Sequence, residues 1–398
     1  MRRLPRQVRM LIVGSFVNRL GTFIVPYLAL VLRREFRLSE ATVGALMMAF
    51  GAGSIVSILV GGYLTDRLGR RFTLLLSLFG SGSLAIAMAF ATTLAVFIPL
   101  LVALGFLADL YRPAASALIS DQLPSHQRAT GFASLRMAVN LGFAFGVATG
   151  GFIADWHWRL LFLGDGLTTA LYGAIVYVFI SETRPAPHRV GKAGGEQSPW
   201  LDPVQLQITL SGFAACLLLA CHVTALPLAI TLRAGYPARV FGMLVGVNGL
   251  VIAFCEVSVV SWIKGRRRLR VAALGMMLLG TGFALTGLFL HWAWFLMSLL
   301  VWTAGEILAM PQQMAFVADW APPAARGRYL SLYQGGWSLA FALNPIIVLP
   351  LHARLSEPVF WTLALVVSTP AAFLLLHLDR VADRPERLRG HDEEPGLV

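Results

Sequence analysis

Eight charged, imidazole or amide side chains stand inside long apolar stretches of this chain, where each needs a chemical reason. They are Arg19, Asp109, Arg112, Arg136, Asn140, His222, Glu256 and Glu306. A charge near the centre of a membrane-spanning helix costs roughly a few kcal/mol at least, so such residues are candidates for proton or substrate binding. A desolvated carboxylate can bind a proton and release it when a cation approaches. Glu306 and Asp109 are therefore the first candidates for proton coupling.

The same residues also allow purely structural interpretations. Asp109 and Arg112 are three residues apart, so they can neutralise each other on one helix. Arg19 can instead pair with Asp109 to fix the packing of two helices. Arg136 and Asn140 share one helix face, and His222 is interpreted as a polar wall residue rather than a proton relay.

The composition indicates which elements must position these side chains. The chain is 57% hydrophobic and 13% charged, with mean hydropathy +0.72. A soluble domain carries about a quarter charged residues, so an all-α membrane protein is expected. The net charge of +12 lies in short loops between apolar runs, which argues against nucleic acid as a partner. We expect a lipid bilayer and a small-molecule substrate as partners, and a monomer.

Twelve apolar stretches have the length of a membrane-spanning helix. They cover residues 9–32, 41–64, 72–91, 95–118, 130–154, 158–180, 205–228, 240–263, 271–290, 293–318, 329–351 and 357–378. The longest polar interruption predicts a linker at 182–204, which is rich in Pro, Gly and charged residues. The predicted domains are therefore a six-helix bundle at 1–181, a second at 205–380, and a tail at 381–398.

The distribution of Lys and Arg predicts the orientation in the membrane. Segments on the side of the N-terminus hold 22 of the 32 Lys and Arg residues, and the opposite loops hold seven. Positive residues favour the cytoplasmic side. We therefore expect a multi-pass protein of the plasma (bacterial inner) membrane, with both termini and the linker cytoplasmic.

A shift of 198 residues superimposes the fourth span and its loop on the tenth. The matched pairs are Pro113 with Pro311, Ala117 with Ala315, Asp121 with Asp319, Pro124 with Pro322, and Arg128 with Arg326. Because each half has an even number of spans, the two halves share one orientation. This predicts a parallel repeat of two six-helix bundles, as in two-bundle transporters.

A charged hinge follows the second span, in the stretch "GGYLTDRLGRR". It contains Gly62, Asp66, Arg67, Gly69, Arg70 and Arg71. The spacing G-x-x-x-D-R-x-G-R-R resembles the signature hinge of the major facilitator superfamily. The resemblance implies that family's fold and a transporter working by alternating access. Asp66 is expected to accept hydrogen bonds from a neighbouring helix N-terminus, and Arg70 to reach Asp121, so that these residues form a cytoplasmic gate.

A glycine ladder in the fifth span extends the resemblance. It consists of Gly142, Gly146, Gly150 and Gly151. It is similar to an element of the superfamily's proton-coupled drug exporters, although Val147 stands where that element has proline. Leu101 also occupies the position of an arginine that those exporters carry in the fourth span. Glycine at four-residue spacing equally allows close packing of helices.

The expected function is proton-coupled export of small lipophilic or cationic compounds. The alternative is a proton-coupled symporter of sugars or small metabolites with the same fold. A non-transporting sensor or a membrane-embedded enzyme is less favoured, because the short loops hold no catalytic cluster and no phosphate-cradling motif occurs. No metal site and no cofactor are expected, with the proton gradient as the energy source. Cys216, Cys221 and Cys255 are interpreted as small buried hydrophobes.

Overall fold

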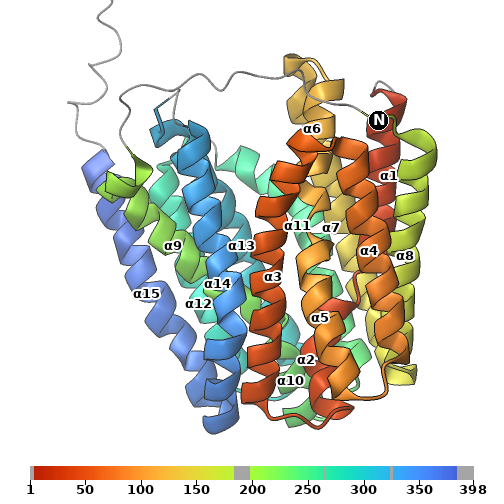
Figure 1. Cartoon of the computed structure of the whole chain (residues 1–398). Coiled ribbons are helices and arrows are strands. Elements are labelled where there is room, and N and C mark those ends of the chain that lie inside the picture. Colours follow the sequence, from red (N-terminus) through yellow and green to blue (C-terminus); the bar gives the residue numbers. More distant parts are fainter. Residues whose placement is uncertain (1–3, 183–197, 264, 323–325, 383–398) are drawn as a thin grey trace, which may run out of the picture.

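Backbone groups in lipid must be satisfied within the chain, and the computed structural model achieves this with helices. It describes residues 4–182, 198–263, 265–322 and 326–382. The helices of these residues are α1 (Arg6–Leu20), α2 (Ile24–Arg34), α3 (Glu40–Arg67), α4 (Arg70–Phe90), α5 (Leu94–Ala108), α6 (Tyr111–Gln122), α7 (Ser125–Trp156), α8 (Arg159–Phe179), η1 (Pro199–Leu201), α9 (Pro203–Leu219), η2 (Ala220–His222), α10 (Ala225–Leu228), η3 (Ala229–Arg233), α11 (Ala238–Trp262), α12 (Arg268–Thr286), α13 (Trp292–Trp320), α14 (Arg326–Arg354) and α15 (Glu357–Ala382) (Figure 1).

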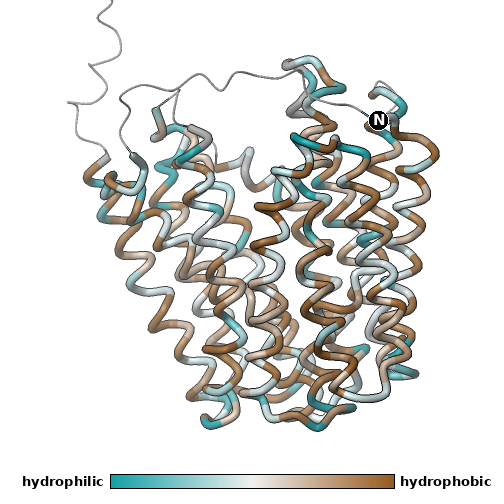
Figure 2. Tube along the Cα trace, in the orientation of Figure 1, coloured by the Kyte–Doolittle hydropathy of each residue, from teal (hydrophilic) through white to brown (hydrophobic). Residues whose placement is uncertain are grey.

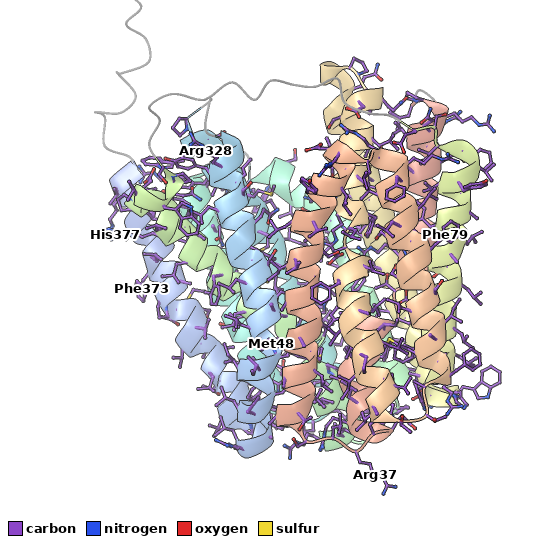
Figure 3. The ribbon with its side chains drawn as sticks, viewed as in Figure 1. Arg37, Met48, Phe79, Arg328, Phe373 and His377 are labelled. Atoms are coloured by element: carbon purple, nitrogen blue, oxygen red, sulfur yellow. The ribbon has the colours of Figure 1, made fainter. Side chains whose placement is uncertain are left out.

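Twelve segments of the described chain are long and apolar enough to cross a membrane, which confirms the predicted all-α membrane fold. They are Arg6–Arg34, Glu40–Arg67, Arg70–Phe90, Leu94–Gln122, Ser134–Trp156, Arg159–Phe179, Pro203–Arg233, Ala238–Glu256, Arg268–Thr286, Trp292–Trp320, Arg328–Arg354 and Glu357–Val381. Figure 2 shows hydrophobic residues along the helices and hydrophilic residues gathered toward their two ends. We call the end where α1 begins and α15 ends the terminal face. The opposite end is the distal face. Arg37, in the connection between α2 and α3, lies at this end (Figure 3).

The helices form two groups, with α1–α8 in one bundle and α9–α15 in the other (Figure 1). The bundles meet where α3 packs on α14 and α7 packs on α11. Small residues allow this approach: a Cβ atom added to Gly246 of α11 would lie 3.0 Å from the Cβ atom of Ala148 in α7. Most of the predicted linker, residues 183–197, and the tail from 383 lie outside the described residues.

Three of the predicted spans, 9–32, 95–118 and 205–228, cross the bundle as predicted, but each is divided into shorter helices. Short interruptions of the helix separate α1 from α2, α5 from α6, and α9 from α10. Each break includes the residue four positions before a proline: Pro26, Pro113 or Pro227. A proline ring clashes with the carbonyl of that residue and removes one helical hydrogen bond. The breaks place non-helical backbone and polar side chains deep in the bundle.

The 198-residue repeat is visible in the side-chain contacts. Arg70 of α4 pairs with Asp121 of α6, with 2.9 Å between Nε and Oδ2. Arg268 of α12 pairs in the same way with Asp319 of α13. Both members of the second pair lie 198 residues after their counterparts, so the structure supports the predicted parallel repeat.

One expectation about the cysteines was wrong. Cys216 and Cys221 are buried, but Cys255 is exposed on the outer side of α11. The apolar run therefore predicted correctly that Cys255 lies in a membrane-spanning helix. It did not predict that Cys255 lies on the exposed face of that helix. In a membrane span, exposure to lipid places no cost on a weakly polar thiol.

Helix packing through the glycine ladder gives a stability prediction. A Cβ atom at Gly146 of α7 would lie 2.6 Å from the carbonyl oxygen of Arg19 and 2.8 Å from that of Leu20. These are rigid backbone atoms, so we expect Gly146→Ala to lower the free energy of unfolding by about 1–3 kcal/mol. Unfolding in detergent, followed by circular dichroism, measures the change.

The matched control is Gly335→Ala in α14, because a Cβ atom there meets nothing within 4 Å. Replacing this helical glycine should be neutral or stabilising by up to about 1 kcal/mol. Equal destabilisation by the two variants would contradict the packing role of Gly146.

Candidate functional site

A cavity of about 580 Å³ lies between the two bundles near the middle of the helices. Its volume falls within the range of small-molecule sites, which is about 300–1,000 Å³. Six of the eight side chains that sequence analysis singled out line it: Arg19, Asp109, Arg112, Asn140, His222 and Glu306. Trp302 and Trp337 add aromatic surface on the side of the second bundle.

The charges on the first-bundle wall are arranged around the break between α5 and α6. Asp109 is the residue that ends α5, and its carboxylate pairs with Arg112, with 2.6 Å between Oδ1 and Nε. The hydroxyl of Ser54 in α3 also donates a hydrogen bond to Asp109. The local pairing of Asp109 with Arg112 is therefore the alternative that the structure adopts.

Arg19 does not pair with Asp109, the other structural alternative. Its Nη2 donates a hydrogen bond of 2.6 Å to the hydroxyl of Tyr111. The Nε of Arg19 is buried without a hydrogen-bond partner among the described residues. Within those residues Arg19 also has no carboxylate at ion-pair distance, so a cation without a paired anion faces the cavity.

Glu306 of α13 is the corresponding group on the second-bundle wall. Its Oε2 lies 3.3 Å from Nδ2 of Asn248 in α11, which also donates to the hydroxyl of Thr303. No Lys or Arg of the described chain lies within ion-pair distance of Glu306. This carboxylate therefore has one amide hydrogen bond and no neutralising charge, and a proton or a cationic ligand is the natural complement.

Two predicted cavity residues lie elsewhere. Arg136 of α7 and Glu256 of α11 are not in the cavity wall and form an ion pair with each other. The Arg136 side chain is 61% exposed, whereas that of Glu256 is 14% exposed. The pair links the two bundles on the terminal side of the cavity.

Asp165 of α8 is a cavity residue that sequence analysis missed. Its Oδ2 accepts a hydrogen bond of 3.2 Å from the backbone N–H of Ile24, the first residue of α2. The break between α1 and α2 exposes this N–H, and a helix N-terminus favours an anion. Asp165 lies within a predicted apolar span, so the rule that selected Asp109 would also have selected it.

The hinge residues form the predicted contact between Arg70 and Asp121. Arg70 is 5% exposed, and its Nη1 also donates to the carbonyl oxygen of Thr65 at 3.0 Å. Asp66 lies 3.8 Å from Arg70, and its side chain is 78% exposed. The prediction that Asp66 accepts hydrogen bonds from a neighbouring helix N-terminus is not met in this conformation.

Another carboxylate occupies a helix N-terminus at the hinge. Glu182 accepts hydrogen bonds from the backbone N–H groups of Arg71 and Phe72, at 3.1 and 3.0 Å. Gly69 adopts φ +108°, a conformation that favours glycine, and leads the chain into α4 at this point. Asp379 takes a similar place in the second bundle, pairing with Arg267 and Arg270.

The remaining residues of the hinge and of the glycine ladder, apart from Gly62, make packing contacts or hydrogen bonds outside the cavity. Arg67 lies over the ring of Tyr63, and the carbonyl of Tyr177 accepts a hydrogen bond of 2.8 Å from Arg71. Gly62 borders open space. In the ladder, Gly142 and Gly146 pack on α1, Gly150 on Tyr27, and Gly151 on the start of α11.

Bonds between the bundles gather at the distal face. Asp155 of α7 accepts hydrogen bonds from the backbone N–H groups of Ala238 and Arg239 at the start of α11, at 2.6 and 3.1 Å. Glu40 of α3 contacts His352 of α14 at 2.8 Å. The bundles are therefore held together at the distal face in this conformation.

Twelve membrane-spanning segments of the described residues, in two repeated bundles around a charged central cavity, define a two-bundle membrane transporter. The sequence profile described as Major Facilitator Superfamily matches residues 11–345, and the chain belongs to this superfamily. It is a multi-pass secondary transporter and not an enzyme.

Relatives and solved structures agree with this assignment. The chain is 23% identical over 379 residues to a Na(+), Li(+), K(+)/H(+) antiporter of Planococcus maritimus, covering 86% of this chain and 89% of the relative. It is 27% identical over 180 residues to the quinolone resistance protein NorA of Staphylococcus aureus, covering 45% and 46%. The crystal structure of a POT family transporter in complex with 5-aminolevulinic acid aligns with TM-score 0.80 and 14% identity, over 96% of this chain and 97% of that one.

The repeated ion pairs give a comparison within one molecule. Arg70 is buried and also binds a backbone carbonyl, whereas the Arg268 side chain is 47% exposed. We expect Arg70→Gln to lower the free energy of unfolding by about 1–3 kcal/mol, because it leaves the buried carbonyl oxygen of Thr65 and the carboxylate of Asp121 without a charged donor. Arg268→Gln should cost less than about 1 kcal/mol, as is usual for exposed pairs.

Thermal unfolding of both variants in the same detergent measures this difference. A larger loss for Arg268→Gln would show that burial does not decide the strength of these pairs.

Proposed function

We propose that the protein exports small lipophilic or cationic compounds in exchange for protons, by alternating access to the central cavity. The observation that carries this proposal is Glu306, a half-buried carboxylate in the cavity wall with an amide partner and no cation partner among the described residues. A proton and a cationic substrate compete for one such carboxylate. This competition is what exchange requires, because the site is emptied of one ligand when the other binds.

The surroundings of Glu306 suit an amphipathic cation. Trp302 and His222 line the same wall, with ring centroids 6.3 Å apart. Aromatic faces attract organic cations. Trp302 is itself 1% exposed and stacks on Phe283, so it supports the wall from behind, whereas the half-buried Trp337 of the same wall is open to a ligand. The wall therefore offers a rigid apolar surface beside one negative charge.

The activities of two relatives, as their names give them, support exchange and export without assigning a substrate. One relative is named as an antiporter of monovalent cations and protons, and another as a quinolone resistance protein. We further propose a monomer in the plasma membrane with both termini cytoplasmic, since the terminal face carries the excess of Lys and Arg. The energy source is then the proton gradient, with no cofactor.

The second candidate is symport of a polar metabolite with protons. It is favoured by Arg19, whose guanidinium faces the cavity without a paired carboxylate and would suit an anionic substrate group. Among the solved structures with this fold are a nucleoside transporter and transporters of the POT family. Exchange and symport differ in the direction in which a pH gradient drives the substrate.

Proteoliposomes with an imposed pH gradient and a clamped membrane potential test the proposal. The probe is tetraphenylphosphonium, a lipophilic cation with a permanent charge. Its passive distribution across the membrane therefore does not depend on the pH gradient. Exchange moves it into the more acidic compartment for either orientation of the protein. Glu306→Gln should reduce this movement by about tenfold or more, because the variant cannot exchange a proton at that site. Asp109→Asn should reduce it less, since Asp109 is already neutralised by Arg112.

The matched control is Glu35→Gln, which removes an exposed carboxylate after α2 and should leave transport unchanged. Movement of the probe or of polar metabolites toward the alkaline compartment would contradict exchange and support symport. Full activity of both the Glu306 and Asp109 variants would remove these carboxylates from the mechanism.

A further inference from the structure

A histidine lies buried between two carboxylates at the distal face, away from the central cavity. His352 of α14 has a side chain that is 1% exposed. Its Nδ1 lies 2.8 Å from Oε2 of Glu40, and its Nε2 lies 3.1 Å from Oε1 of Glu357. The second contact is at ion-pair distance, with an angle outside hydrogen-bond geometry. We call these three residues the distal triad.

The geometry of the distal triad determines how many protons it needs. A neutral imidazole has one N–H group and one lone pair. With the proton on Nδ1, the unprotonated Nε2, which carries partial negative charge, would lie 3.1 Å from a carboxylate oxygen, which is an unfavourable contact. A protonated imidazole makes both contacts attractive. The arrangement therefore fits one proton more than a neutral histidine carries.

The surrounding charges do not remove this need. Arg33 of α2 lies 4.0 Å from Oε1 of Glu40, and Arg233 of η3 lies 3.4 Å from Oε1 of Glu357. Each carboxylate therefore has one arginine nearby, so neither has to be protonated to be stable. Arg34 of α2 is directed to the carbonyl oxygen of Thr231. The indole of Trp361 in α15 donates 2.8 Å to Oε2 of Glu357 and fixes that carboxylate.

The distal triad crosses the boundary between the bundles. Glu40 begins α3 in the first bundle, whereas His352 and Glu357 belong to α14 and α15 in the second. Parting of the bundles at this face separates Glu40 from His352 and leaves the contact of His352 with Glu357 in place. The imidazole thus has two carboxylates when the face is closed and one when it is open.

We infer that the distal triad is a proton-binding gate, in which a proton on His352 holds the distal face closed and its loss allows the bundles to part there. Because the closed state offers the protonated imidazole a second carboxylate, it binds the proton more tightly than the open state. By linkage, acidification on the distal side then shifts the protein toward closure. A hollow of about 400 Å³ beside Glu40 and His352 gives water and protons room to approach.

The gate is a second proton site, separate from Glu306. In the export cycle proposed above, a proton from the distal side would close the protein behind a departing substrate. That place in the cycle rests on the proposed function. The gate itself requires only that the two bundles move.

Distance measurements between spin labels test the gate without substrate or transport. The labels replace Thr92 in the turn before α5 and Leu288 in the turn before α13, both exposed at the distal face of opposite bundles. The three native cysteines are replaced by serine or alanine, and the protein is held in lipid nanodiscs. From about pH 9 to about pH 5 the short-distance population should grow, by up to about tenfold in the closed-to-open ratio per pH unit for one proton.

His352→Gln should abolish this pH response, and Glu40→Gln should do the same by removing the partner across the boundary. The matched controls are His157→Gln and His291→Gln, which remove exposed histidines from the same face and should leave the response intact. Nitrogen NMR of labelled histidine in the closed state adds a direct readout, in which both ring nitrogens of His352 should carry protons.

A pH response that survives in His352→Gln, or a neutral His352 ring in the closed state at acidic pH, would overturn the gate. Failure of the proposed export gives a different result. The proteoliposome assay then shows no exchange, while the distances between the labels still change with pH.

Discussion

The structure depends on one constraint: a charge inside a low-dielectric helix bundle must be neutralised within the molecule or left facing water or a ligand. Asp109 meets this constraint with Arg112, and Arg136 with Glu256. These pairs tie neighbouring segments together and leave little charge for a substrate. Arg19 and Glu306 are different, since each faces the cavity from an opposite wall without an oppositely charged partner among the described residues. The cavity is thus polarised between its two bundles.

The helix breaks explain how an apolar bundle contains so polar a cavity. Pro26, Pro113 and Pro227 each follow a break, and the breaks release backbone groups that polar side chains then satisfy. Asp165 accepts from the N–H that begins α2. Asp109 itself ends α5. A continuous helix would have satisfied its own backbone and offered these carboxylates fewer donors. The prolines therefore account for polar backbone groups inside the bundle, which the mean hydropathy of the chain does not reveal.

The sequence alone was sufficient for the spans and the repeat, because apolar length and a 198-residue shift are both properties of the linear chain. In the structure the same shift relates the pair of Arg268 and Asp319 to the pair of Arg70 and Asp121. The distal triad was not predictable in this way, since Glu40 and His352 are 312 residues apart and neither motif nor spacing connects them. Arg136 and Glu256 were assigned to the cavity because depth along a helix was known and facing direction was not. Direction depends on tertiary packing, and only the folded chain fixes it.

The ion pairs of the two faces differ in a way that bears on movement. At the terminal face, Arg70 with Asp121 and Arg268 with Asp319 each join helices of one bundle. Such pairs survive when the bundles rock as rigid bodies. At the distal face, Asp155 and Glu40 bind partners in the opposite bundle, so their contacts must break when that face opens. The repeated pairs therefore keep each bundle intact, whereas the contacts between the bundles, including Arg136 with Glu256 on the terminal side of the cavity, change when the bundles move. Because a histidine is among those contacts, the balance between the two conformations becomes a function of proton concentration.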